Sequence, residues 1–488
     1  MQNNYYKKVF QNLNTNNIFY KYFNETYTYK ESLLFAIKML IYFKRNKLKK
    51  NFIICTFANK SFEMYSSIFP ILISQITWVP ISLSYPDSKI KEIVKQVNPN
   101  LIIYDHIFKK RVSFLNSIKK ISFNEISKIQ LTIDRSDLIE KKIKELNFKS
   151  IAFIYFTSGS TGESKGIKIS HKNIIADIFA QLRHLHMEKN RLVFGDYYDT
   201  SFSIFFDIYY PAIYLGAAIS PSKLDFESYL PIEHIEKNQV NVLICVPSTI
   251  QRIKDFYKNK KFNFFLKTII VTGEPFYLSV LKYFYSCLKF KNIFNCYGGT
   301  EMSNWVFFHK CKRSDLLQYK KYNVVPIGKN FYNTKAKIIN TELVVKGPTI
   351  SQGYINKKLN SKFLFGKNNT FYTSDKVVKK YKTYICVGRL DKMVKLRGYR
   401  IDLFDIERNL RKLKYINNAI VFEKKKKNYE NYICTVLELN KVIKESKIRK
   451  DLGKYLPVYM LPKKIFLLKK FPTNVNGKID RKKIQNFY

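Results

Sequence analysis

Short apolar runs and amphipathic stretches alternate in the first part of the chain. The runs NFIICTF, WVPISL and LIIYD lie between residues 51 and 105, and residues 87–97 have the apolar spacing of an amphipathic helix. Short β-rich runs that alternate with helices predict α/β layers with largely parallel sheets. Later apolar runs extend this pattern, and each closes in turn or cap residues: 150–156, 240–248 and 266–274. They predict buried strands that end at a ligand-binding edge.

The pattern changes after Lys329. The runs become shorter and richer in turns, as in ELVVKGPTISQGY, which predicts a small β subdomain. The last part of the chain has strand and helix patterns of its own. We therefore predict a large N-terminal domain of layered α/β sheets plus the β subdomain over residues 1–390. A hinge near Asp391 is predicted to join it to a small α+β C-terminal domain over residues 391–488.

The charge of the chain is strongly positive. It has 86 lysine and arginine residues against 37 aspartate and glutamate residues, a formal net charge of +49. Such a balance raises nucleic acid or an anionic membrane as a partner. However, asparagine, isoleucine, phenylalanine and tyrosine are abundant together with lysine, as A/T-rich codons would produce, and the lysines are scattered along the chain. We therefore expect no specific nucleic-acid partner.

The seven cysteines show no CxxC spacing and no histidine at metal-ligand spacing. They are typical of reduced core residues in a cytosolic protein. The N-terminus lacks an apolar run of signal-peptide length, and the apolar stretch 64–81 is broken by proline and polar residues. We therefore expect a cytoplasmic protein without a membrane span.

A glycine-rich loop, FTSGSTGESKGIKISH, occupies residues 156–171 directly after a predicted strand. Gly159, Gly162 and Gly166 leave backbone N–H groups able to approach phosphate oxygens. Hydroxyls and one cation extend this donor set: Thr157, Ser158, Ser160, Thr161 and Lys165. This composition predicts a phosphate-binding loop. It is not a Walker A loop, because the lysine precedes its glycine.

This loop resembles the phosphate-loop signature of the acyl-adenylate-forming superfamily, which includes acyl-CoA ligases, firefly-type luciferases and the adenylation domains of nonribosomal peptide synthetases. Further segments resemble the other signatures of the superfamily, in order: TWVPISLSYP (77–86), VTGEPF (271–276), NCYGGTEMS (295–303), ELVVKGPTISQGY (342–354), FYTSDKV (371–377), GRLDKMVKLRGYRIDLFDIE (388–407), LPVYMLP (456–462) and NVNGKIDRKK (474–483). The nearest patterns are those of stand-alone peptide-synthetase adenylation domains and D-alanine:carrier-protein ligases.

The resemblance implies that the chain activates a carboxylic acid with ATP as an acyl-adenylate and releases pyrophosphate. Bringing two anions together at the α-phosphate requires cationic groups and Mg²⁺. Glu301 is the expected metal ligand, Thr300 is expected at the α-phosphate, and Lys478 is expected to bridge the attacking carboxylate and the phosphoester oxygen. The β- and γ-phosphates are expected to be held by the loop residues Thr157, Ser158, Gly159, Thr161, Gly162 and Lys165.

The same resemblance assigns residues to the nucleoside. Asp375 is expected to accept from both ribose hydroxyls, with Arg389 on the ribose side. Tyr297 is expected to stack on adenine and Asn295 to read its amino group. Neighbouring motif positions complete the nucleotide site: Gly273, Glu274 and Gly298. Ser374 stands where the family has glycine, so it needs a negative φ or bears backbone strain.

Asp391 is the expected hinge about which the small domain rotates after adenylation. The rotation is expected to exchange Lys478 for a face that contains Lys395 and Gly398, where glycine lets a phosphopantetheine arm pass close to the backbone. The implied acceptor is this thiol on a separate carrier protein. Coenzyme A is the alternative, in which case the chain is an acyl-CoA ligase for a non-amino carboxylic acid.

Residues 194–218 resemble the segment in which amino-acid-activating members carry an aspartate for the α-ammonium of the substrate. One register places that carboxylate at Asp199, and another, with one residue deleted, places Ser203 at the amine position. Burying an ammonium without its counter-ion costs several kcal/mol, so the second register argues against an ordinary α-amino acid. We favour an amino acid, and a hydroxy, keto or other small acid stays open. A non-catalytic nucleotide-binding homologue would lack Lys478, Glu301 or Asp375, which are all present.

Overall fold

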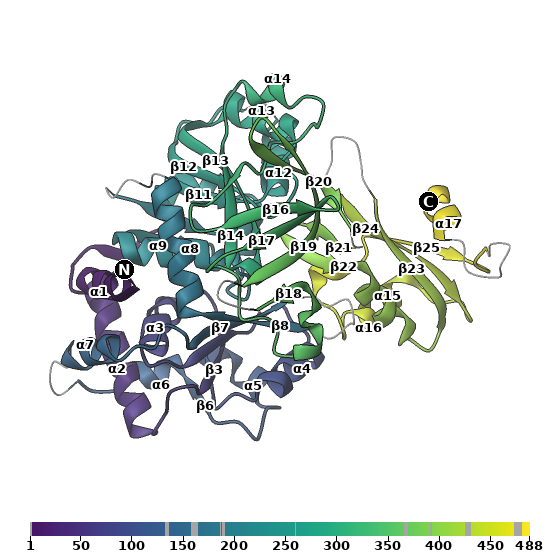
Figure 1. Ribbon diagram of the computed structural model, residues 1–488. Helices are drawn as coiled ribbons and strands as arrows, with labels where there is room; N and C mark the ends of the chain where they lie inside the picture. The colour runs from purple at the N-terminus through teal and green to yellow at the C-terminus, as the bar shows by residue number, and fades with distance from the viewer. Residues whose placement is uncertain are drawn as a thin grey trace. The chain divides into compact units, whose positions relative to one another are not determined.

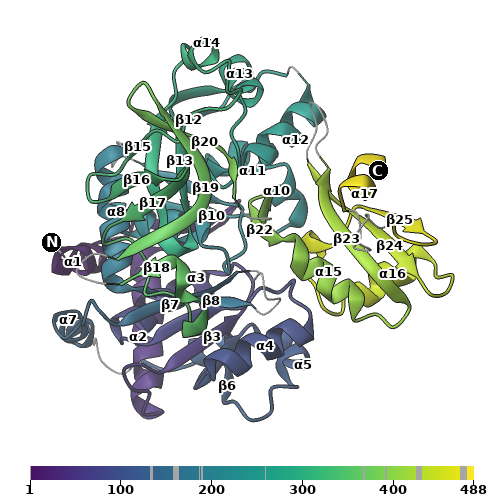
Figure 2. The ribbon, with the colours of Figure 1, turned by 45° about the vertical axis from the view of Figure 1, so that its right-hand side comes forward.

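The computed structural model describes residues 2–131, 136–157, 164–185, 187, 191–258, 260–365, 369–390, 393–424, 431–472 and 481–488. Within these ranges the chain forms two compact units (Figure 1, Figure 2). The larger consists of Met1–Leu83, Val97–Tyr155 and Gly166–Leu390. The smaller consists of Ser84–Gln96, Phe156–Lys165 and Asp391–Tyr488.

A mainly parallel sheet contains the strands closest to the glycine-rich loop. Its order is β6-β5-β3-β4-β7-β8, with bounds β6 (Lys120–Ser122), β5 (Leu101–Tyr104), β3 (Ile53–Phe57), β4 (Thr77–Pro80), β7 (Ile151–Thr157) and β8 (Lys165–Ser170). β3 pairs in parallel with both β4 and β5, as expected where crossover segments connect successive strands. The predicted strands at residues 51–57, 101–105 and 150–156 are confirmed by β3, β5 and β7.

A second, longer sheet carries the motifs VTGEPF (271–276) and NCYGGTEMS (295–303). Its order is β15-β14-β13-β12-β11-β9-β10-β1-β2, with bounds β15 (Lys329–Asn330), β14 (Asn304–Lys310), β13 (Lys289–Gly299), β12 (Phe265–Val271), β11 (Val242–Cys245), β9 (Val193–Asp196), β10 (Ala218–Pro221), β1 (Ile18–Tyr22) and β2 (Glu25–Thr28). The pairs from β10 to β13 are parallel, whereas β14 runs antiparallel to β13. The chain reverses between β13 and β14 through the short helix η2 (Thr300–Met302). The motif NCYGGTEMS therefore ends β13 and turns at the carboxyl edge of the parallel strands.

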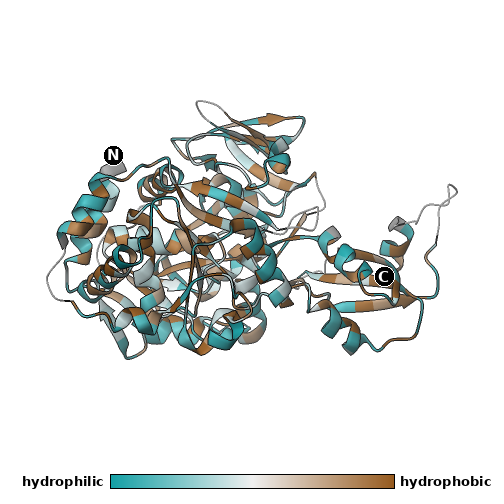
Figure 3. Cartoon of the chain, turned by 90° about the horizontal axis from the view of Figure 1, so that it is seen from below, coloured by the Kyte–Doolittle hydropathy of each residue, from teal (hydrophilic) through white to brown (hydrophobic). Residues whose placement is uncertain are grey.

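Helices cover the sheets, and many show a teal and a brown face in Figure 3. Among them, α9 (Ile204–Leu215) is apolar on nearly all sides and buried from Ile204 to Ile213, as expected of an interior helix. It packs against α1 and α8. The other helices are α1 (Gln2–Leu13), α2 (Tyr29–Arg45), α3 (Phe62–Ile73), α4 (Asp87–Val97), η1 (His106–Phe108), α5 (Lys109–Val112), α6 (Phe123–Ser127), α7 (Ser136–Lys144), α8 (His171–His184), α10 (Asp225–Tyr229), α11 (Ile232–Asn238), α12 (Pro247–Tyr257), α13 (Leu278–Cys287), α14 (Asp315–Gln318) and η3 (Lys357–Lys362). The bounds of α4 confirm the helix predicted at residues 87–97.

The turn-rich region after Lys329 forms the predicted β subdomain. Its sheet has the order β16-β17-β19-β18 with β20 paired to β19, and bounds β16 (Lys335–Ile339), β17 (Glu342–Lys346), β18 (Phe363–Leu364), β19 (Thr370–Lys380) and β20 (Thr383–Arg389). The antiparallel pair β19 and β20 places Asp375 opposite Arg389.

The C-terminal part of the chain is α+β. A hairpin of β21 (Met393–Leu396) and β22 (Tyr399–Asp402) precedes a sheet of β23 (Ile416–Lys424), β24 (Tyr432–Leu439) and β25 (Lys464–Leu468), with helices α15 (Leu403–Arg411), α16 (Glu445–Leu452), η4 (Val458–Met460) and α17 (Arg481–Phe487). It has an apolar core of its own, in which Ile401, Leu410 and Ile448 are fully buried. Together with the layered sheets above, this confirms the predicted fold class.

The seven cysteines lie in the described part of the chain, where no disulfide joins them and six are buried. This agrees with the prediction of reduced, mostly core cysteines. A search of the same residues for membrane spans found no helix with both the length and the apolar character to cross a bilayer.

Candidate functional site

Asp375 brings together residues from three distant motifs. It lies on β19, is 4% exposed, and accepts a hydrogen bond from the Tyr297 hydroxyl at the end of β13. Arg389 on β20 donates from Nη1 to Asp375 Oδ1 at 2.5 Å. Burial, followed by the charge of Asp375, raises the pKa of Tyr297 well above its usual value, so the phenol is neutral and donates its proton. Three of the four side chains predicted for ribose and adenine therefore form one contact group.

The residues predicted to lie near adenine on β13 are held in fixed positions. Asn295, on β13, donates from its amide nitrogen to the carbonyl oxygens of Val325 and Pro326 at 3.3 and 2.8 Å. These bonds fix the orientation of its amide. A Cβ on Gly298 would lie 1.4 Å from the carbonyl oxygen of Asn304, so only glycine fits where β13 and β14 approach each other here.

The predicted adenine-side residues Gly273 and Glu274 follow β12. Gly273 has φ of +84°, which suits glycine. Glu274 accepts from the backbone N–H and the hydroxyl of Ser248, at 2.9 and 3.2 Å, in the first turn of α12. Glu274 therefore has a structural role in satisfying a helix N-terminus, which the motif alone did not indicate.

Ser374 adopts the positive φ that is expected of the glycine it replaces in the family. Its φ is +58°, in the left-handed region that costs a residue with a Cβ about 1–2 kcal/mol. Its backbone N–H donates to Glu342 Oε1 at 2.7 Å, and its hydroxyl accepts from Lys362 Nζ at 2.6 Å. The serine thus keeps the glycine geometry of the loop and bears the strain.

We predict that Ser374→Gly raises the free energy of unfolding by about 0.5–1 kcal/mol, because relief of strain outweighs the loss of one partly buried hydrogen bond. Ser374→Ala is the matched control, since it removes the hydroxyl and keeps the Cβ. Urea unfolding of the two variants would measure the effect. A gain in the alanine variant, or none in the glycine variant, would contradict this account.

Glu301 and Thr300 form the turn after β13. Glu301 is 1% exposed, and its Oε1 accepts from the Tyr354 hydroxyl at 2.9 Å. Within the residues that the structure describes, no cluster of three or more His, Cys, Asp or Glu side chains could hold a metal by itself. A single carboxylate fits Mg²⁺, which takes one or two carboxylates and completes its shell with substrate phosphates and water.

Ser203 and Thr300 are neighbours. Their hydroxyl oxygens lie 3.0 Å apart, and Asn304 donates from its side-chain amide to the Ser203 carbonyl oxygen. Ser303 and Asn304, which follow the turn, both have positive φ, at +53° and +80°. Ser203 therefore borders the residue expected at the α-phosphate.

Asp199 lies in the loop between β9 and α9. Its Oδ2 accepts from the Ser82 hydroxyl at 2.7 Å, and its Oδ1 accepts from the Ser201 backbone N–H at 2.8 Å. The carboxylate is partly exposed. Ser82, which departs from the aspartate preferred by the family, therefore contacts the candidate amine-binding carboxylate.

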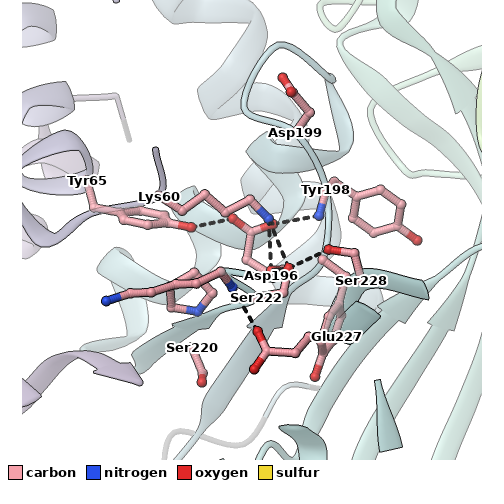
Figure 4. A network of polar contacts seen from close by, with 12 residues as sticks. Lys60, Tyr65, Asp196, Tyr198, Asp199, Ser220, Ser222, Glu227 and Ser228 are labelled. Atoms are coloured by element: carbon pink, nitrogen blue, oxygen red, sulfur yellow. Dashed lines mark hydrogen bonds and ion pairs between the residues drawn. The ribbon is translucent and has the colours of Figure 1, made fainter. Parts of the chain in front are cut away.

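A buried ion pair anchors the start of the same loop (Figure 4). Asp196, the last residue of β9, is fully buried, and its Oδ1 lies 3.5 Å from Lys60 Nζ. Tyr65, on α3, donates its hydroxyl to the other oxygen, and the backbone N–H of Tyr198 donates to Oδ1 at 3.1 Å. Asp199 points away from this group in Figure 4. The motifs gave no sign of it, although a lysine shortly after one buried strand and an aspartate at the end of another were a possible signal.

The remaining predicted residues are distributed as follows. Thr157 ends β7 and Lys165 begins β8. Lys395 lies on β21, and Gly398 has φ of +81° beside Arg397 with φ of +53°. The latter two form the two-residue turn of the hairpin, which requires positive φ at both positions, so Gly398 also has a structural role. Some predictions fall outside the described residues: Ser158, Gly159, Ser160, Thr161, Gly162, Asp391 and Lys478.

Comparison with known proteins gives a family match over most of the chain. The model of the family described as AMP-binding enzyme matches residues 9–355. Bacitracin synthase 2 of Bacillus licheniformis is 26% identical over 477 residues, covering 93% of this chain and 17% of that protein. The chain therefore spans less than a fifth of the length of this relative.

Solved structures share the fold. The Vibrio cholerae adenylation domain AlmE, in complex with glycyl-adenosine-5'-phosphate, superposes with a TM-score of 0.85 at 19% identity, over 98% of this chain and 97% of that one. The o-succinylbenzoate CoA synthetase of Bacillus subtilis has a TM-score of 0.82 at 16% identity, over 98% of each chain.

Proposed function

Because this chain belongs to the AMP-binding enzyme family, and is therefore an adenylate-forming ligase that activates a carboxylic acid with ATP, we propose that its substrate is an amino acid. We further propose that the aminoacyl group passes from the adenylate to the phosphopantetheine thiol of a carrier protein. The family match confirms the predicted membership of the acyl-adenylate-forming superfamily and the predicted ligase activity. The amino acid and the carrier are supported by the relatedness to a peptide synthase and by the fold shared with an adenylation domain that binds a glycyl-adenylate.

The observation that carries the ATP-dependent activation step is the convergence of Tyr297, Asp375 and Arg389. A buried carboxylate flanked by a phenol and a guanidinium is suited to accept hydrogen bonds from two vicinal hydroxyls, as in a ribose ring. Arg389 and Tyr297 hold this carboxylate in one orientation before the nucleotide arrives, which reduces the entropy lost on binding.

The chemistry of the transfer is expected at the turn after β13. Glu301 would hold Mg²⁺, which would neutralise charge on the phosphates when bound. Thr300 would donate to the α-phosphate, while Thr157, Lys165 and the loop between them would hold the departing pyrophosphate. Lys478 would bridge the attacking carboxylate and the phosphoester oxygen, and its loss would act mainly on adenylation.

The acid is proposed to lie between Thr300 and the loop that carries Asp199. Ser203 contacts Thr300 and would line the carboxylate end of the acid. Asp199, oriented by Ser82 and Ser201 and still partly exposed, would supply the counter-charge for the ammonium. This assignment uses both candidate residues in different roles, so it needs no choice between the two registers.

We predict that Asp199→Ala lowers kcat/KM for the amino acid about 100-fold, because a charge-assisted contact of about 1.5–3 kcal/mol is lost and a buried ammonium is left unpaired. The KM for ATP should change little. Pyrophosphate exchange over a panel of amino, hydroxy and fatty acids would identify the acid, and the variant would then be assayed with it. Ser82→Ala is a milder control that removes one partner of Asp199 and keeps its charge.

Exchange only with acids that lack an amine, or unchanged exchange in Asp199→Ala, would overturn the amine-binding role. No exchange with any acid, while Mg-ATP still binds, would overturn the activation reaction for this chain. Incubation of the adenylate with a phosphopantetheine-bearing carrier protein or with coenzyme A would separate the two acceptors. Thioester formed on coenzyme A alone would favour an acyl-CoA ligase, for which the shared fold with the o-succinylbenzoate enzyme is the supporting observation.

A further inference from the structure

Two aspartates lie in the interior of the larger unit and, in the described part of the chain, neither forms a salt bridge. Asp177 on α8 is 3% exposed, and Asp207 on α9 is 0% exposed. Gln181, one turn after Asp177, donates from Nε2 to Asp177 Oδ2 at 2.9 Å and to Asp207 Oδ1 at 2.6 Å. A single amide group therefore bridges two carboxyl groups. α8 and α9 are adjacent in Figure 1, and both pack against β14.

Three oxygens of this group have no hydrogen-bond partner among the residues that the structure describes: Asp177 Oδ1, Asp207 Oδ2 and Gln181 Oε1. All are acceptors, so the group lacks donor hydrogens. Two charged carboxylates at this depth would be costly to desolvate and would repel each other. A proton on one carboxyl group removes one charge and supplies one donor.

The electrostatic setting agrees with this geometry. Burial raises the pKa of both carboxyl groups well above the usual range, the charge of Asp207 raises that of Asp177 further, and Gln181 opposes both rises. In the described part of the chain, the titratable groups of other elements whose pKa the pair raises are Cys296 on β13 and Tyr155 on β7. Burial first and nearby carboxylates second raise the pKa of both, so each is neutral and neither can compensate the pair.

Asp207 is connected to the candidate site through Asn304. Asn304 begins β14, which packs against α9; it opposes the rise in the pKa of Asp207, and its side-chain amide donates to the Ser203 carbonyl oxygen. Ser203 in turn contacts Thr300 through its hydroxyl, at 3.0 Å. Asn304 has φ of +80°, a conformation that asparagine adopts more readily than other residues with a Cβ, and its hydrogen bond to Ser203 orients its amide.

We propose that Asp177 and Asp207 form a buried acid pair that shares one proton and positions Ser203 and Thr300 through Asn304. Asp207 touches neither substrate nor nucleotide in this account, so it is a positioning residue. The positioning role rests on the proposed function, whereas the shared proton does not.

The first test is the pH dependence of stability. A carboxyl group whose pKa is raised on folding stabilises the native state below its usual pKa of about 4, and this stability is lost as pH rises through the folded value. Asp207→Asn supplies an –NH₂ group in place of the proton and has no proton to lose. The melting temperature of Asp207→Asn minus that of the wild type should therefore increase by about 3 °C or more when the pH is raised from about 5 to about 8.

Asp177→Asn provides a second variant and should show the same gain. The double variant should gain no more than either single variant, because the pair needs only one donor. Asp255→Asn removes an exposed carboxylate on α12 and should show no such pH-dependent gain. A difference that does not change with pH would overturn the shared proton. A wild-type melting temperature that depends on whether sodium, potassium or tetramethylammonium chloride is used would overturn it as well, because a bound cation would then neutralise the pair.

The second test is the pH profile of pyrophosphate exchange, measured with an acid that the enzyme activates. The ratio of the wild-type exchange rate to that of Asp207→Asn should fall as pH rises over the same range. Once the proton is lost, the two carboxylates of the wild type repel each other and displace Asn304. The same ratio for Asp255→Asn should stay flat. A flat ratio for Asp207→Asn would overturn the positioning role. If no acid supports exchange, the proposed function fails, and the melting curves still confirm or overturn the acid pair.

Discussion

Asp375→Ala is expected to lower kcat/KM for Mg-ATP by about 100-fold to 1,000-fold. Each ribose hydroxyl that donates to the carboxylate contributes about 1.5–3 kcal/mol as a charge-assisted bond. The alanine also leaves Arg389, whose side chain is 13% exposed, without its carboxylate. Removing one partner of a buried ion pair costs about 3–5 kcal/mol, so the free energy of unfolding should fall as well.

The nucleotide itself provides the sharpest control for this prediction. The wild type should discriminate ATP from 2'-deoxy-ATP and 3'-deoxy-ATP, and Asp375→Ala should lose most of this discrimination, because the acceptor of both hydroxyls is gone. Asp375→Asn keeps an acceptor for the Tyr297 hydroxyl and removes the charge. Its discrimination should therefore lie between that of the wild type and that of Asp375→Ala. An alanine variant that still discriminates the deoxynucleotides would show that another residue reads the ribose.

Gly298→Ala is expected to lower the exchange rate at least about 100-fold and the free energy of unfolding by about 1–3 kcal/mol. The added Cβ would lie 1.4 Å from the carbonyl oxygen and 2.4 Å from the carbonyl carbon of Asn304, so the backbones of β13 and β14 would have to separate. Asn304 binds Ser203, so the displacement would reach the substrate side as well as the base side of the site.

The neighbouring Gly299 offers a matched control. A Cβ there would meet the Glu301 carboxylate at 3.6 Å and the Met302 methyl group at 3.7 Å, which are ordinary contacts. Gly299→Ala should therefore keep its melting temperature within about 2 °C of the wild type. Equal destabilisation by the two substitutions would mean that the close approach at Gly298 does not determine the effect. The measurements are thermal unfolding and pyrophosphate exchange.

The sequence predicted the layered strands well because their signal is local. A run such as residues 101–105 is apolar throughout and bounded by turn residues, which is the pattern of a strand buried on both faces, and β5 occupies it. The bounds of α4 followed in the same way from its amphipathic spacing. The signal at Ser374 was also local. A glycine at this position in the family indicates a particular backbone conformation, and Ser374 has the positive φ.

The polar networks could not be predicted in this way. Lys60 lies between β3 and α3, Asp196 ends β9 in the other sheet, and the two are 136 positions apart, so no periodicity relates them. Asp207 is one charged residue in an otherwise apolar helix, and Asp177 is one of several polar residues in an amphipathic helix. Only the packing of α8 against α9 brings them together. Residue spacing determines which side of an element a side chain occupies, whereas tertiary packing determines what it faces there.

The ion pair of Lys60 and Asp196 has a consequence for how this enzyme could acquire a new substrate. The loop that carries Asp199 begins at a carboxylate bound by residues before and within α3 and is held again at Ser82 after β4. The start and the middle of the loop are thus attached to segments that follow β3 and β4. Selection for a different acid would therefore act by exchanging side chains along a fixed loop, since changing the loop length would break attachments that the whole unit depends on.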